Sequence, residues 1–381
     1  MTRSGLLLVA ALLSAGLTAC TADAPSGNRD ATVPTPTWAP SLTASPAGTV
    51  TRTTGAPASV AVEVGGSRTA VALDTAVVVL DERGAELARI PVDQPARAVV
   101  ALPGGGFRAL AGATVLNLPP LAGASSPSTG APSPASSSPA GSVPAPSAPA
   151  SSAPASSAPG ASASGPSSTG LSGGAWPGLA RWTLPAAGSA LAVPPKGDWT
   201  AVALPDRGDV IILSATGAVT RTIDAGGRPT AVAADDTRVA VVDASQSSLT
   251  VFDAANGAKQ EAIRAGDGAV TVTADGTGRF VVVDARDGEL LVFETGPLIL
   301  RQRHPVAGSP FGAAYDPTRR TLWVAVTQRN EVVGYDLSGG TPREVGRHPS
   351  VRLPVAVSVD PPTGTVAVAG SAEGLVQRIG S

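Results

Sequence analysis

The sequence is poor in the residues from which many catalytic and metal sites are built. Its 381 residues include one cysteine and two histidines, which excludes an intrachain disulfide and leaves too few ligands for a cysteine- or histidine-rich metal site. Lysine occurs only at Lys196 and Lys259, and the formal net charge is -2. A broad nucleic-acid-binding surface needs a basic excess, so we expect no nucleic-acid partner.

The amino terminus has the features of a lipoprotein signal peptide, predicted over residues 1–19. Arg3 supplies a positive charge, and the apolar run over residues 5–15 is too short to span roughly 30 Å of hydrocarbon. The run ends in Leu-Thr-Ala-Cys, which resembles a bacterial lipobox with Cys20 as the residue that receives a diacylglyceryl group. The alternative is an ordinary secretory signal with an unrelated cysteine. We expect the mature chain to be anchored in the cell membrane through Cys20, on its extracytoplasmic face.

Two segments are predicted to lie outside any packed core. Residues 20–47, rich in Thr, Pro, Ala and Ser, are interpreted as a lipidated, disordered tether. Residues 121–178 are almost wholly Ser, Pro, Ala and Gly, and no charged residue occurs between Arg108 and Arg181. Such sequences bury too little apolar surface to offset the entropy of ordering them. The second segment is therefore predicted to be a disordered insert.

The remainder of the chain, residues 48–381, contains a repeat with a period near 40. Short Val- and Ala-rich runs alternate with turn residues, which is typical of an all-β array. The runs begin with the motifs SVAV at 59, RAVV at 97, ALAV at 190, PTAV at 229, AVTV at 269, FGAA at 311 and PVAV at 354.

The best-preserved unit, residues 229–266, predicts four strands, a to d, over 230–233, 239–243, 249–253 and 259–263. Four strands in about 40 residues indicate a β-propeller blade. Seven openings predict seven blades, but the last unit lacks its fourth strand. We expect residues 48–54 to supply it and close the ring, which removes an exposed sheet edge. The insert then lies between strands c (114–118) and d (179–184) of the second blade.

The repeats resemble propeller units of the YVTN type, which are similar to NHL and WD40 repeats. The resemblance rests on VAVVD at 239–243 followed by LTVFD at 249–253. The carboxyl half, especially 290–306 and 332–345, also resembles actinobacterial lipoproteins of the LppL type. These resemblances imply a surface-anchored propeller and no particular reaction.

Three motifs that could carry chemistry have simpler explanations. The G-x-S-x-G match at 170–174 lies in the insert, without the strand and helix of a nucleophile elbow. His304 and His348 occur in equivalent Arg-His-Pro motifs, so we interpret them as structural repeat positions. The run from Asp284 to Glu289 only partly resembles a calcium loop, and a polar turn between strands b and c explains it better. No catalytic residue, metal ligand or cofactor is predicted.

The strongest functional prediction concerns the loops between strands b and c and between d and a, which share one face of a propeller. Loops on a rigid scaffold are frequent binding sites, although every propeller needs polar loops. We therefore expect a non-enzymatic scaffold that binds a protein or a polar envelope ligand. The alternative is a propeller hydrolase of the lactonase type with a metal at the channel mouth, for which Glu63 is the one obvious acid. The candidate binding face comprises Asp206, Arg207, Asp209, Asp243, Gln246, Asp284, Arg286, Asp287, Gln328, Arg329 and Asn330.

Overall fold

The computed structural model describes residues 33–36, 39–121 and 176–380. The chain divides into two compact units, Met1–Asp30 and Ala31–Ser381, and all described residues belong to the second. The predicted signal peptide, Cys20, the 170–174 motif and most of the insert lie outside the described residues. A search of the described residues found no helix long and apolar enough to cross a membrane.

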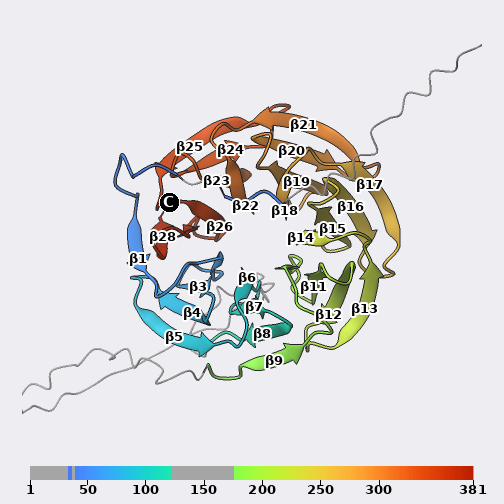
Figure 1. Ribbon diagram of the computed structural model, residues 1–381, viewed down its shortest axis with the longest axis horizontal. Helices are drawn as coiled ribbons and strands as arrows, with labels where there is room; N and C mark the ends of the chain where they lie inside the picture. Colours follow the sequence, from blue (N-terminus) through green and yellow to red (C-terminus); the bar gives the residue numbers. More distant parts are fainter. Residues whose placement is uncertain (1–32, 37–38, 122–175, 381) are drawn as a thin grey trace, which may run out of the picture. The chain divides into compact units, whose positions relative to one another are not determined.

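The described residues form a ring of seven four-stranded antiparallel sheets, as the sequence predicts. Figure 1 shows the sheets arranged like blades around a central opening, with strand a of each blade innermost and strand d outermost. Blades 1 to 6 use four consecutive strands each, from β2–β5 to β22–β25. Blade 7 combines β26–β28 from the carboxyl end with β1 from the amino end. The prediction of an all-β, seven-bladed propeller is confirmed.

The strands have the following bounds. In the first half of the chain they are β1 (Thr49–Arg52), β2 (Ser59–Val62), β3 (Arg68–Ala72), β4 (Ala76–Asp81), β5 (Glu86–Pro91), β6 (Ala96–Ala101), β7 (Phe107–Ala111), β8 (Thr114–Leu118), β9 (Ala180–Thr183), β10 (Ala190–Ala192), β11 (Trp199–Leu204), β12 (Asp209–Ser214) and β13 (Val219–Asp224). In the second half they are β14 (Pro229–Ala234), β15 (Arg238–Asp243), β16 (Ser248–Asp253), β17 (Lys259–Arg264), β18 (Ala269–Ala274), β19 (Arg279–Asp284), β20 (Glu289–Glu294), β21 (Ile299–Pro305), β22 (Pro310–Asp316), β23 (Thr321–Val326), β24 (Glu331–Asp336), β25 (Arg343–Pro349), β26 (Pro354–Val359), β27 (Val366–Gly370) and β28 (Leu375–Ile379).

The amino-terminal strand β1 closes the ring by pairing with β28. The two strands are antiparallel, with Thr49 opposite Arg378 and Arg52 opposite Leu375. Gly48 precedes β1 with a φ of 71°, and a Cβ atom there would lie 2.0 Å from the main-chain oxygen of Arg378. A side chain at position 48 would therefore clash with the strand it approaches. This is the closure predicted from the incomplete last repeat.

Seven hydrophobic clusters hold the blades together, one at each contact between neighbouring blades. Strand β19 shows how one strand serves two of them. Phe280 and Val282 belong to the cluster shared with blade 4, and Val281 and Val283 to the cluster shared with blade 6. Because successive side chains point to opposite faces of a sheet, a strand buried on both faces reads as an unbroken apolar run. Strands b and c of this chain have that composition.

Buried polar groups add links between blades. Arg108 of β7 is 3% exposed and donates to Thr200 and to the main-chain oxygen of Ala215, both in blade 3. Its guanidinium also lies 5.1 Å from the centre of the Trp182 ring. Burial lowers the pKa of Arg108 from its usual value. A buried guanidinium of this kind is stable only when its donors are satisfied, so these contacts fix how blades 2 and 3 meet.

The insert leaves blade 2 where the sequence predicts, between β8 and β9. Its described ends are fastened to each other, since the Trp176 indole is 3% exposed and donates to the main-chain oxygen of Pro119 at 2.8 Å. Trp176 packs in the cluster between blades 1 and 2, with Leu121 and Leu179 beside it. Two residues of the predicted insert, 121–178, therefore pack against blade 2, namely Leu121 and Trp176.

The folded unit also begins upstream of residue 48. Ala39 is fully buried, and its main-chain oxygen accepts a hydrogen bond from Arg352. The Ala47 amide donates to Pro349, and the Ala47 oxygen accepts from Gln377. Residues 39–47 were assigned to the tether because their Thr- and Pro-rich sequence has no periodicity. Their partners lie some 300 positions away, where a local pattern gives no signal.

Deleting residues 48–54 should destabilise the propeller because it removes β1 and exposes the edge of β28. Each lost main-chain hydrogen bond contributes about 1 kcal/mol, so we expect the melting temperature to fall by at least about 5 °C. Calorimetry of the full chain and of the deletion measures this. A deletion of equal length, residues 21–27, is the control, and equal melting temperatures for the two deletions would contradict closure by β1.

Candidate functional site

The structure brings the predicted loops to one face of the ring. The b–c turns that carry the candidate residues connect β11 to β12, β15 to β16, β19 to β20 and β23 to β24. The loops from strand d to the next strand a contact these turns through hydrogen bonds. We call this surface the loop face. Seven of its candidate residues are exposed, namely Asp206, Arg207, Gln246, Arg286, Asp287, Gln328 and Arg329.

Two of the predicted residues, Asp243 and Asp284, are buried and hold the loops in place. Asp243 Oδ1 accepts from the amides of Ser245 and Gln246, and Oδ2 accepts from the amide of Arg228 in the preceding d–a loop. Asp284 repeats the arrangement one blade later and accepts from the amides of residues 286 and 287 and of 267 and 268. Each carboxylate joins a b–c turn to a d–a loop. These two residues shape the loop face and do not present their carboxylates to a ligand.

Asn330 is also buried, at 5% exposure, and has a φ of 52°. Its side-chain oxygen accepts from the Leu353 amide at 2.9 Å, and its side-chain nitrogen donates to the oxygen of Pro40 at 3.1 Å. The left-handed conformation is one that asparagine tolerates better than most residues. Asn330 therefore fastens the amino-terminal segment to the loop face.

The remaining candidate residue, Asp209, is half-buried and pairs with Arg207 at 2.8 Å. The exposed Asp206 lies 3.4 Å from the Arg228 guanidinium. Surface pairs of this kind contribute little to stability. Their side chains are consequently free to exchange partners with a ligand at small cost.

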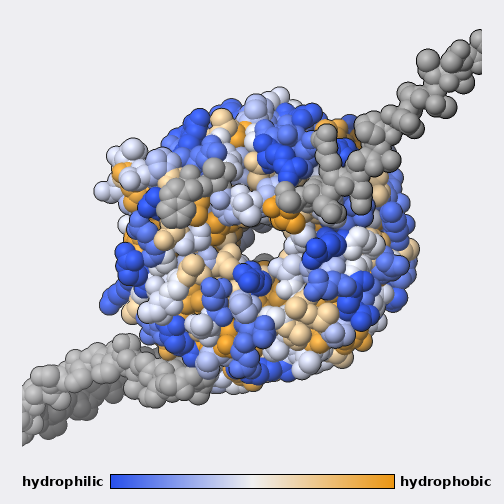
Figure 2. Space-filling view, viewed as in Figure 1, coloured by the Kyte–Doolittle hydropathy of each residue, from blue (hydrophilic) through white to orange (hydrophobic). Residues whose placement is uncertain are grey.

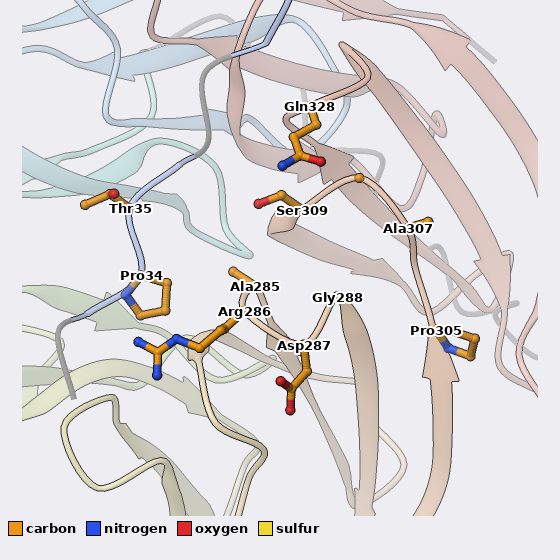
Figure 3. Close-up of a pocket in the computed structure, with 11 residues that line it drawn as sticks. Pro34, Thr35, Ala285, Arg286, Asp287, Gly288, Pro305, Ala307, Ser309 and Gln328 are labelled. Carbon is orange, nitrogen blue, oxygen red and sulfur yellow. The ribbon is translucent and has the colours of Figure 1, made fainter. Parts of the chain in front are cut away.

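A cavity of about 580 Å³ lies on the loop face between blades 5 and 6. Figure 3 shows its lining, in which Pro34 and Thr35 of the amino-terminal segment face the turn that carries Arg286 and Asp287. Ser309 and Gln328 lie on its opposite side. The lining contains charged, amide and hydroxyl groups, which suit a polar ligand or a protein side chain. The contribution of residues 34 and 35 could not be predicted from the sequence, because these residues belong to no strand and to no repeat.

The central channel has a volume of about 600 Å³ and is lined by strand a of every blade. Figure 2 shows its opening at the centre of the ring. In blades 2, 4, 5, 6 and 7 the pairing of strands a and b shifts register near the start of strand a. A bulge of this kind redirects the side chain at the shift, and in blade 2 that residue is Arg97. Within the described lining, Arg97 is the only charged residue.

Glu63, the one acid that the sequence offered for an axial metal, does not line the channel. It is 2% exposed and accepts from Arg68, from Ser67 and, at 2.8 Å, from the Gly106 amide of blade 2. Its carboxylate is used to join blades 1 and 2. The described lining of the channel contains no carboxylate and no histidine, so the lactonase-type alternative has no ligand set there.

The two histidines lie near the carboxyl ends of β21 and β25, at the equivalent positions expected from the repeat. His304 makes an edge contact with Tyr335, with the ring centres 5.2 Å apart, and His348 lies 5.6 Å from the Trp323 ring. Burial lowers the pKa of His304 from its usual value. Both imidazoles are packed against aromatic rings on the outer part of the ring of blades.

Comparisons with known proteins show the fold alone. No family model matches the sequence, and no curated protein matches it. Among solved structures, the chain is similar to hydrazine synthase of Kuenenia stuttgartiensis, with a TM-score of 0.60 and 13% identity over 87% of this chain and 97% of that one. Such a likeness supports the propeller architecture, and one fold serves many unrelated functions.

Replacing Asp243 should destabilise the protein far more than replacing its exposed neighbour Asp206. In Asp243→Ala three amides lose their acceptor at a largely buried site, which should cost about 2–4 kcal/mol. Asp206→Ala should change the free energy of unfolding by no more than about 0.5 kcal/mol. Urea unfolding of both variants measures the difference. Equal stabilities would show that the Asp243 carboxylate does not hold the loops.

Proposed function

We propose that the protein is a membrane-anchored extracytoplasmic lipoprotein whose propeller binds a protein or polar ligand through the loop face. The observation that carries this proposal is the contrast within that face. Asp243, Asp284 and Asn330 hold the loops in place, while seven polar candidate residues of the loop face are exposed, and three of these, Arg286, Asp287 and Gln328, line the cavity. Because the main chain of this surface is already held in place, binding orders side chains alone, which lowers its entropic cost.

The amino-terminal segment supports a particular orientation. Pro34 and Thr35 line the cavity of the loop face, and the lipidation site proposed from the sequence, Cys20, lies a short distance upstream. Even a fully extended chain of that length reaches at most about 50 Å. The proposed orientation therefore turns the loop face toward the membrane, so that its partner lies at or near the membrane surface.

Lipidation is tested by the variant Cys20→Ser. Without the thiol no diacylglyceryl group can be attached, and since the described residues contain no membrane-spanning helix, the protein should then leave the membrane fraction. Fractionation of cells followed by intact-mass measurement gives the result, with the neighbouring Thr21→Ala as the matched control. Membrane association of Cys20→Ser equal to that of the control would contradict lipid anchoring.

Partner binding is tested by crosslinking from the two ends of one strand. Gln246 precedes β16 on the loop face, and Asn256 follows β16 on the opposite face, and both are exposed. A photoreactive amino acid placed at either position samples one face of the same blade. In intact envelopes we expect a discrete crosslinked product from position 246 and none from position 256. Identical products from both positions, or a product from 256 alone, would refute the loop face as the binding surface.

A further inference from the structure

Three carboxylates converge at the b–c turn of blade 5. Asp284 is the last residue of β19, Asp287 lies in the turn and Glu289 is the first residue of β20. One oxygen of each lies within 4.8 Å of the others. Asp284 accepts hydrogen bonds from four main-chain amides, which accounts for its burial. Two further acids lie beside it without such a structural role for both of their oxygens.

Glu289 has a buried oxygen without a partner. The residue is 7% exposed, and its Oε2 accepts from Arg303 Nε across to β21. Its Oε1 is buried and makes no hydrogen bond with any described residue. A buried acceptor left unsatisfied costs free energy, and more so when it is charged. A bound cation at this position would satisfy it.

The next blade shows which part of this arrangement belongs to the repeat. In blade 6 Glu331 begins strand c and pairs with Arg347, just as Glu289 pairs with Arg303. The position equivalent to Asp287 is occupied by Arg329. The cross-strand pair of glutamate and arginine is therefore a feature of both blades. Compared with blade 6, the turn of blade 5 carries an additional negative charge, and only in blade 5 of these two does an acid in the turn lie beside the pair.

The charges at the turn do not balance. Asp284, Asp287 and Glu289 face one pairing cation, Arg303, since Arg264 pairs with Asp267. Arg286 donates to the main-chain oxygen of Asp267, and Figure 3 shows its guanidinium pointing away from the Asp287 carboxylate. Of the ion pairs among the described residues, one, between Arg303 and Glu289, reaches this group of three acids.

We propose that this turn binds one calcium ion, held by the carboxylates of Asp287 and Glu289 beside the charge of Asp284. Carboxylates are hard ligands, and Ca–O distances of roughly 2.3–2.6 Å allow two ligand oxygens on opposite sides of the ion to lie up to about 5 Å apart. Magnesium requires shorter distances in a stricter geometry, and zinc favours the imidazole and thiolate ligands that this group lacks. Water completes the coordination on the exposed side of Asp287. The site goes beyond the proposed partner binding and does not depend on it.

Calcium titration of the purified full chain tests the site. After treatment with EDTA, calorimetric titration with calcium chloride should show one ion per chain, with a dissociation constant of about 10⁻⁴–10⁻³ M, as in extracellular calcium modules. Calcium should also raise the melting temperature. Asp287→Asn and Glu289→Gln should each weaken binding at least about tenfold.

The matched control is Glu331→Gln, which removes the equivalent charge and cross-strand pair from blade 6. It should bind calcium as the unaltered chain does. Melting curves recorded in EDTA show whether each variant is folded, and Asp287, being exposed, can be replaced without opening the core. Three results would overturn the proposal: no calcium binding at about 10 mM, an affinity of Asp287→Asn for calcium equal to that of the unaltered chain, or tighter binding of magnesium than of calcium.

Discussion

Packing of each blade against both of its neighbours is the constraint on which the rest of the structure depends. Strands b and c are buried on both faces, and each of the seven clusters draws side chains from two adjacent blades. No blade can bury its apolar surface alone, so the ring must close. Closure requires β1, since blade 7 has only three strands of its own. The pairing of β1 with β28 follows from that requirement.

The loops of the loop face are held to the ring by the buried side chains of two aspartates and one asparagine. Asp243 and Asp284 each accept main-chain amides from two loops, and Asn330 joins a third pair of segments. Loops held in this way resemble an extension of the sheet more than free connections. Both proposed roles of this face, binding of a partner and binding of a cation at the blade 5 turn, depend on side chains that project from a fixed main chain.

Much of the architecture could be predicted from the sequence because the same pattern of strands and turns recurs in successive units. The four strands predicted in residues 229–266 agree with the structure to within one or two residues, and the incomplete last unit indicated the closing strand. The site was less predictable. Asp243 and Gln246 look alike as polar turn residues, and only the approach of the d–a loop buries the first. The Glu63 carboxylate accepts hydrogen bonds from both blade 1 and blade 2. Residues 39–47 pack on partners near the opposite end of the chain. Neither contact is encoded in a local sequence pattern.

Hydrogen exchange of the full chain tests most directly whether the loop face is a preorganised surface. The account predicts that the amides of Ser245, Gln246 and Arg228, which donate to Asp243, exchange nearly as slowly as those of the adjoining strand β15. The amide of Asn256, which donates to Asp253 in an exposed turn at the other end of β16, provides the comparison within the same blade. If the three loop amides exchange as fast as an unstructured peptide while β15 stays protected, the loop face is not held by the ring and the account is contradicted.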